Sequence, residues 1–92
     1  MVNDIDATFA ALSDPTRRRV VELLAERPLR ASEIADRAGM TRPAMSRHLR
    51  ALRGSGLVRV ELSEADARTR TYRVRADRLI ALRAWLDQLQ AF

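Results

Sequence analysis

The residues from Ala31 to Leu52, ASEIADRAGMTRPAMSRHLRAL, constrain the fold more than any other part of this chain. Apolar residues at helical spacing precede Gly39, and a second set follows Thr41. Glycine reaches positive φ without a Cβ clash, so Gly39 can end one helix where the chain reverses. Thr41 can then cap a second helix, because its hydroxyl can accept from a free backbone N–H. The stretch predicts two short helices around a tight turn.

The predicted second helix has two chemically different faces. Its apolar side recurs at intervals of three and four residues, at Met45, His48, Leu49 and Leu52. The opposite side carries Pro43, Arg47 and Arg50. A helix held by its apolar side, with arginines on the other, fits the major groove of double-stranded DNA. This pair of helices is therefore predicted to be a helix-turn-helix with a recognition helix.

Helices are also expected on both sides of this motif. Asp14 is a suitable N-cap and Pro15 suits the first position of a helix that Pro28 ends. Gly54 and Gly56 are expected to close the recognition helix, and Asp77 to cap the last helix. The predicted helices cover residues 4–12, 16–26, 31–38, 42–53 and 78–90.

The pattern changes period between the recognition helix and the last helix. Apolar and charged residues alternate in 57–62, and 69–74 is rich in β-branched and aromatic residues. The segment 64–68 between them is polar and short. The fold predicted is mainly α with a two-stranded β-hairpin, in the order α-α-α-α-β-β-α. A hairpin directly after a recognition helix is the wing of a winged helix-turn-helix.

Length and composition indicate one small domain over residues 1–92. The chain has no cysteine, which excludes disulfides, thiolate metal sites and cysteine redox chemistry. No apolar run is long enough to cross a membrane, and the first residues are acidic where a secretory signal is basic. A cytoplasmic protein is expected. No nucleophile with a neighbouring base, no phosphate-cradling glycine loop and no metal-ligand cluster is evident, so the chain is predicted not to be an enzyme and to need no cofactor.

Positive charge is concentrated in the second half of the chain. All 17 basic residues are arginine, and the net charge is +5. Residues 41–75 contain nine arginines and three acidic residues, whereas residues 1–40 carry a net charge of −1. This segregation is expected of a surface that binds a polyanion. In contrast, Arg17, Arg18 and Arg19 are expected to be solvated or paired with Asp14, Glu22 or Glu26, and one of the three is a candidate for a contact with the DNA backbone.

The candidate DNA-binding residues lie in the recognition helix and the wing. Arginine can bond bidentately to guanine, so Arg42, Arg47 and Arg50 are expected to include at least one base reader. Arginines at the wing tip are candidates for the minor groove or for phosphates. His48, on the packing side, is expected to be structural. The full predicted set is Thr41, Arg42, Pro43, Ala44, Ser46, Arg47, Arg50, Arg68 and Arg70.

The terminal helices, about 4–12 and 77–91, are predicted to be dimerisation elements. The last helix holds leucines near heptad spacing, and a domain of this size has limited room to cover them. Large exposed apolar patches usually mark interfaces. The alternative is that this helix only completes the core of a single chain. A two-fold dimer would set two recognition helices about 34 Å apart, one turn of DNA. The predicted interface residues are Ile5, Phe9, Leu79, Leu82, Trp85, Leu86 and Leu89.

With these elements in this order, the chain resembles the ArsR/SmtB family of small bacterial repressors. The resemblance covers residues 9–92 and is carried by FAALSDPTRRRVVELL at 9–24, TRPAMSRHLRALRGSGLV at 41–58 and RTRTYRV at 68–74. It implies a homodimeric winged helix that binds a palindromic operator and blocks transcription. Alternatives from other classes are a nonspecific architectural DNA-binding protein and a winged-helix module that binds a protein partner through its last helix.

The chain departs from the metal-sensing members of that family. Their thiolate site lies on the first motif helix, where residues 32–36 read SEIAD, without cysteine. Their other site uses histidines and carboxylates on the last helix, which here offers Asp77 and Asp87 but no histidine. The resemblance is therefore to the metal-independent autorepressor branch, which shares the ALSDPTRR opening. No metal is expected, and the sequence indicates no pocket for a small-molecule effector.

Overall fold

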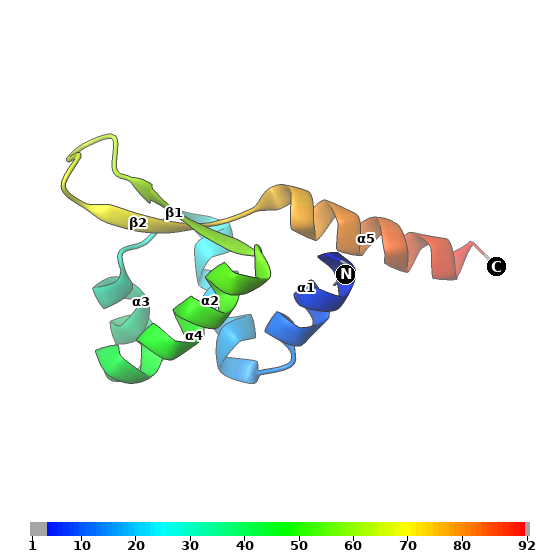
Figure 1. Ribbon diagram of the computed structural model, residues 1–92, viewed down its shortest axis with the longest axis horizontal. Helices are drawn as coiled ribbons and strands as arrows, with labels where there is room; N and C mark the ends of the chain where they lie inside the picture. Colours follow the sequence, from blue (N-terminus) through cyan, green and yellow to red (C-terminus); the bar gives the residue numbers. More distant parts are fainter. Residues whose placement is uncertain (1–3, 92) are drawn as a thin grey trace.

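The computed structural model describes residues 4–91 as helices around one antiparallel hairpin (Figure 1). Residues 1–3 and 92 lie outside the described part. The element order confirms the predicted winged helix-turn-helix. The bounds are α1 Asp4–Leu12, α2 Pro15–Glu26, α3 Ala31–Ala38, α4 Arg42–Ser55, β1 Val58–Leu62, β2 Arg70–Val74 and α5 Ala76–Gln90.

The ends of α2, α3 and α4 follow the predicted capping chemistry. Asp14 Oδ1 accepts from the backbone N–H groups of Thr16 at 2.8 Å and Arg17 at 3.1 Å. Thr41 Oγ1 accepts from the N–H of Ala44 at 3.3 Å. Gly39 has a φ of 67°, the left-handed conformation that a helix C-cap favours in glycine. The turn between α3 and α4 is thus determined by local sequence.

Two boundary predictions were wrong. Helix α4 continues through Gly54 to Ser55 and is closed by Gly56 alone, at a φ of 82°. Helix α5 begins at Ala76, so Asp77 lies in its first turn rather than at the cap, which is Arg75. The start of α5 is determined by a tertiary contact. The N–H of Arg75 donates to the carbonyl of Leu57 at 2.9 Å and fixes the chain one residue before α5.

The hairpin pairs Val58 with Val74 and Leu62 with Arg70. A third segment joins it as an isolated bridge. The N–H of Tyr72 donates to the carbonyl of Leu29 at 2.8 Å, and the N–H of Leu29 donates to the carbonyl of Tyr72 at 3.2 Å. The connection between α2 and α3 is thereby fastened to β2, on the side of the hairpin away from β1.

The core lies between α2, α3, α4 and the base of the hairpin. Apolar side chains from these elements and from the α2–α3 connection are buried together. Its largest fully buried apolar members are Val20, Leu29, Ile34, Met45, Leu52 and Leu57. The predicted apolar face of α4 is therefore the face that holds it in place.

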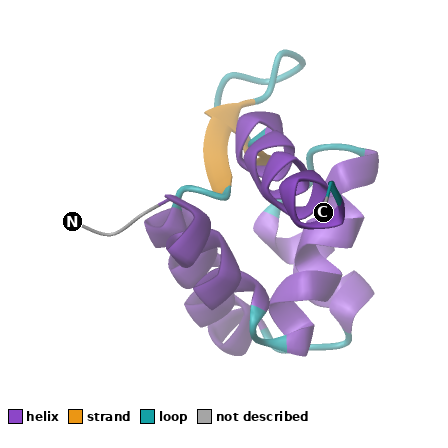
Figure 2. Cartoon of the chain, turned by 90° about the vertical axis from the view of Figure 1, so that its right-hand side faces the viewer, coloured by secondary structure: helices purple, strands orange, loops and turns teal. Residues whose placement is uncertain are grey.

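Helix α5 is nearly outside this core. It packs against α1 and contains no fully buried residue. The molecule measures 47 × 26 × 26 Å, with α5 projecting at one end and the hairpin tip at the other (Figure 1). Figure 2 looks nearly end-on along α5, with α1 beside it and the other helices behind.

Candidate nucleic-acid interface and terminal surface

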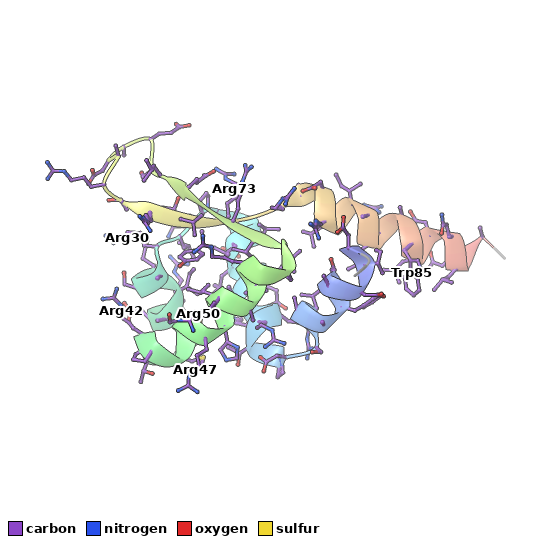
Figure 3. The ribbon with its side chains drawn as sticks, viewed as in Figure 1. Arg30, Arg42, Arg47, Arg50, Arg73 and Trp85 are labelled. Atoms are coloured by element: carbon purple, nitrogen blue, oxygen red, sulfur yellow. The ribbon has the colours of Figure 1, made fainter. Side chains whose placement is uncertain are left out.

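Helix α4 presents one buried and one exposed face, as the sequence predicts. Met45, Leu49 and Leu52 are buried against the core. The exposed side projects away from α5, and Figure 3 labels three of its arginines there. Ala44 is half-buried, whereas the predicted contact residues that are exposed on or next to α4 are Thr41, Arg42, Pro43, Ser46, Arg47 and Arg50.

The arginines of this side share a second property. Within residues 4–91 their side chains make no hydrogen bond and no ion pair, and the same holds for the two predicted wing arginines. Unpaired guanidinium groups keep their full charge and all their donors for an external anion. We call this set the basic face: Arg42, Arg47, Arg50, Arg68 and Arg70.

Two other arginines of the basic second half share one carboxylate. Arg73 Nε lies 2.8 Å from Glu61 Oε1, and Arg59 Nη2 lies 3.8 Å from Glu61 Oε2. Arg73 lies on the side of the hairpin away from α4 (Figure 3). The nine arginines of residues 41–75 therefore do not all contribute to the charge that faces outward beside α4.

The arginine run at the start of α2 does not behave as predicted. Arg17 Nε donates to the carbonyl of Ala11 at 2.6 Å, and Arg18 Nη1 donates to the carbonyl of Leu12 at 2.7 Å. These carbonyls end α1, where a helix carries partial negative charge and free acceptors. Only Arg19 pairs as expected, with Glu22 at 3.6 Å. Two of the three arginines therefore cap a neighbouring helix.

His48 lies on the packing side of α4, as predicted. Its Nδ1 is 3.9 Å from Asp14 Oδ1, and its side chain is 20% exposed. The pKa of Asp14 is held below its ordinary value chiefly by the backbone N–H of Arg17, with smaller contributions from Thr16 N–H and the His48 and Arg17 charges. This contact joins the recognition helix to the start of α2.

At the opposite end, the structure leaves large apolar side chains in solvent. Phe9 and Trp85 pack edge to face with ring centroids 5.2 Å apart, yet they remain 42% and 37% exposed. Leu86 and Leu89 are exposed beside them. We call these four side chains the terminal apolar surface. Ile5, Leu79 and Leu82, also predicted interface residues, are half-buried, and Ile80, outside that prediction, is exposed.

Arg78 joins three helices in the middle of the molecule, and sequence reasoning gave it no role. Its Nη1 donates to the carbonyl of Ser55 at 3.1 Å and lies 3.4 Å from Asp4 Oδ1. Its side chain is only 16% exposed. A Cβ at Gly56 would lie 2.6 Å from its Nη2. The start of α1, the end of α4 and the start of α5 therefore meet on one guanidinium group.

The described part of the chain holds neither a metal centre nor a membrane span. Among residues 4–91, no three His, Cys, Asp or Glu side chains come together in a way that could hold a metal ion. No helix in that range has the length and apolar character needed to cross a membrane.

A helix-turn-helix with an unpaired basic face, followed by a β-hairpin, defines a winged helix-turn-helix of the kind found in transcriptional regulators. Residues 14–60 match the family described as "Bacterial regulatory protein, arsR family". The chain belongs to this family, which confirms the predicted resemblance. The family is one of regulatory proteins, so the chain is not an enzyme.

Individual relatives agree with this assignment. The HTH-type transcriptional regulator Rv2034 of Mycobacterium tuberculosis is 39% identical over 83 residues, 90% of this chain and 75% of the relative. The crystal structure of the ArsR family transcriptional regulator RHA00566 has a TM-score of 0.83 and 32% identity, covering 97% of this chain and 94% of that one. Mb0332 from Mycobacterium bovis, a homodimeric winged helix-turn-helix DNA-binding domain in solution, has a TM-score of 0.72 and 26% identity, covering 96% and 82%.

Proposed function

We propose that this chain is a homodimeric transcriptional repressor that binds a palindromic operator in double-stranded DNA and acts without a metal ion. The observation that carries the proposal is the basic face, whose guanidinium groups have no partner within residues 4–91. Clustered arginines on one face, over the exposed side of a recognition helix and a wing, are the electrostatic footprint of a polyanion-binding surface.

Each predicted DNA-contact residue has a proposed role. Arg47 and Arg50 read base edges in the major groove, while Arg42 and Ser46 reach bases or the adjacent backbone. Thr41 caps α4 beside a phosphate, and Pro43 and Ala44 contact thymine methyl groups. From the wing, Arg68 and Arg70 contact the minor groove or its phosphates.

The proposed partner of the terminal apolar surface is a second copy of this chain. The exposed rings of Phe9 and Trp85 and the neighbouring leucines of α5 form a patch that a two-fold interface would bury. The homodimeric state of Mb0332, whose fold is shared, supports this arrangement. The terminal helices α1 and α5 would then set the two α4 helices about one turn of DNA apart, roughly 34 Å.

The remaining parts of the proposal follow from chemistry. An operator occupied by the dimer is closed to RNA polymerase, so binding represses transcription in the cytoplasm, where bacterial DNA is located. The chain has no cysteine to bind a soft metal, and its one histidine contacts Asp14 at the start of α2. Among residues 4–91, no three His, Cys, Asp or Glu side chains come together to hold a metal ion.

Fluorescence anisotropy tests the proposal. A labelled duplex from upstream of the protein's own gene is titrated beside a scrambled duplex of equal length, at two salt concentrations, with and without chelator. We expect tight, sequence-selective binding that weakens with salt and ignores the chelator. Equal binding to both duplexes would make the protein architectural, and no binding even at low salt would favour a protein partner. Binding that the chelator changes would contradict metal independence.

A further inference from the structure

A groove of about 390 Å³ runs between the first turns of α3 and α4 and strand β2. Its polar lining comes from segments far apart in the sequence. These residues are Arg30, Ser32, Arg42, Thr69, Arg70 and Tyr72. Sequence reasoning singled out Arg42 and Arg70 as DNA contacts but gave no DNA-binding role to Arg30, Ser32 or Tyr72.

The bridge between Leu29 and Tyr72 assembles this groove. The paired hydrogen bonds of these two residues, at 2.8 and 3.2 Å, hold the residue before Arg30 against β2. Arg30 therefore lies beside the wing strand. It lines the same groove as Arg70 and Arg42. Figure 3 shows Arg30 and Arg42 at the same end of the molecule.

Most polar side chains of the lining have no internal acceptor, whereas Thr69 Oγ1 donates to Asp66 Oδ2 at 3.1 Å. The side chains of Ser32, Arg42, Arg70 and Tyr72 make no hydrogen bond within residues 4–91, and no carboxylate of that range lines the groove. Arg30 Nε contacts Glu33 Oε1 at 3.2 Å, which leaves its two terminal nitrogens unpaired. Several free donors converging on one groove, with no acceptor charge in it, match a phosphate.

We infer that this groove is a seat for one phosphate of the DNA backbone, held by Arg30 and Arg42 with the hydroxyl of Tyr72. The inference rests on the proposed function. A second hollow of about 300 Å³ along α4, lined by Pro43 and Ser46, shares Arg42 and Tyr72 with the groove, so the seat is continuous with the face proposed to read bases. Phosphate contacts fix the register of a protein on DNA, so this seat positions α4.

A phosphate contact has a signature that a base contact lacks. Arg30→Ala is expected to weaken binding about tenfold on both the upstream duplex and the scrambled duplex. The slope of log affinity against log salt should become shallower by about 0.9 for each phosphate that the variant no longer neutralises. Arg73→Ala is the matched control, because Arg73 is also an exposed arginine paired with a glutamate but lies on the far side of the hairpin.

A variant that is expected to increase the affinity for DNA distinguishes loss of the phosphate contact from a folding defect. Glu33→Gln keeps an acceptor for the backbone N–H of Arg30 but removes the carboxylate that competes for its guanidinium. It is expected to strengthen binding to both duplexes about two- to threefold, whereas damage to α3 would weaken it. Tyr72→Phe should weaken both by a few-fold without changing the salt slope.

The decisive arm replaces single phosphates of the upstream duplex by neutral methylphosphonates. A methylphosphonate at one particular position of each half-site should lower the affinity of the wild type about as much as Arg30→Ala does. The Arg30→Ala variant should bind this modified duplex as tightly as it binds the unmodified one. If Arg30→Ala loses no more affinity than Arg73→Ala while the wild type binds normally, the seat is refuted and the proposed function stands. If the wild type binds neither duplex, both are refuted.

Discussion

The two ends of the molecule leave different kinds of side chain without a partner. At the α3–α4 and wing end the side chains without a partner are mainly charged: the arginines of the basic face form no ion pair within residues 4–91, and Leu62 is the large apolar side chain exposed there. At the α1–α5 end charges of both signs are present, with Asp4 paired to Arg78 and Asp77 to Arg75, and the side chains that stand out in solvent are apolar: Phe9, Ile80, Trp85, Leu86 and Leu89. Both surfaces are incomplete in one chain, but they call for partners of different chemistry.

The chemistry of the exposed side chains at each end indicates the kind of partner that end binds. Burial of exposed apolar surface is non-directional, so an identical surface across a two-fold axis can cover it. Unpaired guanidinium groups need acceptors with negative charge, which a second copy of the same basic face would not supply. Substitutions at either end, substitutions at the junction between them, and a shift to low pH each test this division.

The first prediction concerns the proposed dimer interface at the terminal apolar surface. Trp85→Glu places a charge in the centre of the terminal apolar surface, where burial would cost far more than exposure. The variant should be monomeric at micromolar concentration by light scattering. Its affinity for the two-half-site duplex should fall by at least about 100-fold, because the second half-site is no longer tethered to the first through the protein.

The matched control places the same charge elsewhere on α5. Ala84 is exposed and lies on the side of α5 away from the leucine stripe. Ala84→Glu should remain dimeric and bind DNA nearly as well as the wild type. A dimeric Trp85→Glu protein would refute the proposed interface.

The second prediction removes one guanidinium from the basic face. Arg47→Ala should weaken binding to the upstream duplex by about 1–3 kcal/mol, the discrimination that one bidentate arginine–guanine pair supplies. Binding to scrambled DNA should change far less, and the dimer should persist. Parallel titrations by anisotropy measure both affinities, with Arg73→Ala as the control of equal charge. Equal losses on the two duplexes would make Arg47 a phosphate contact instead.

The third prediction concerns the junction at Arg78. Gly39 and Gly56 both have positive φ, but a Cβ at Gly39 meets nothing within 4 Å, whereas one at Gly56 meets the Arg78 guanidinium at 2.6 Å. Gly39→Ala should therefore cost about 1 kcal/mol of unfolding free energy, the strain of left-handed backbone alone. Gly56→Ala should cost about 1 kcal/mol more, since the guanidinium must shift.

Urea denaturation of a double-mutant set measures that difference. In an Arg78→Ala background the two glycine substitutions should cost nearly the same, because the group that distinguishes them is gone. A persistent difference would show that Arg78 is not the cause. Arg78→Ala should also lower stability by itself, because the guanidinium holds the Ser55 carbonyl and the Asp4 carboxylate.

The smallest predicted effect is a pH dependence. The pKa of Asp14 in the folded chain lies below its ordinary value of 3.8, chiefly because the N–H of Arg17 donates to its carboxylate. The charged carboxylate therefore contributes stability above its ordinary pKa, and that contribution is lost as the pH falls through the lowered value. Thermal melts between about pH 2 and 6 should show the Tm of the wild type falling towards that of Asp14→Asn. Parallel curves would refute the assignment.

Sequence reasoning succeeded where the information is local. The caps at Asp14, Thr41 and Gly39 each depend on residues within a few positions, and the apolar face of α4 depends on helical spacing alone. The hairpin could be predicted for the same reason, because its period is visible in the chain. The exposed side of the terminal helices followed from how little core a chain of this size can form.

What the sequence could not supply depends on contacts between distant segments. Nothing in the residues before α3 indicates that Leu29 pairs with Tyr72, and so nothing places Arg30 beside the wing. A count of arginines does not separate Arg73, paired with Glu61, from Arg47, paired with nothing in residues 4–91. The same reason explains the misplaced start of α5, which a bond between Arg75 and Leu57 determines.

Sedimentation velocity with a labelled duplex most directly tests whether the two ends have separate partners. It compares the wild type, Trp85→Glu and the triple variant Arg42→Ala, Arg47→Ala, Arg50→Ala. The wild type should sediment as a dimer and as two chains per duplex. The triple variant should remain a dimer that no longer joins the duplex, and Trp85→Glu should be a monomer. A monomeric triple variant, or a Trp85→Glu protein that still places two chains on the duplex as a preformed dimer, would contradict the division between a charged DNA-binding end and an apolar dimerisation end.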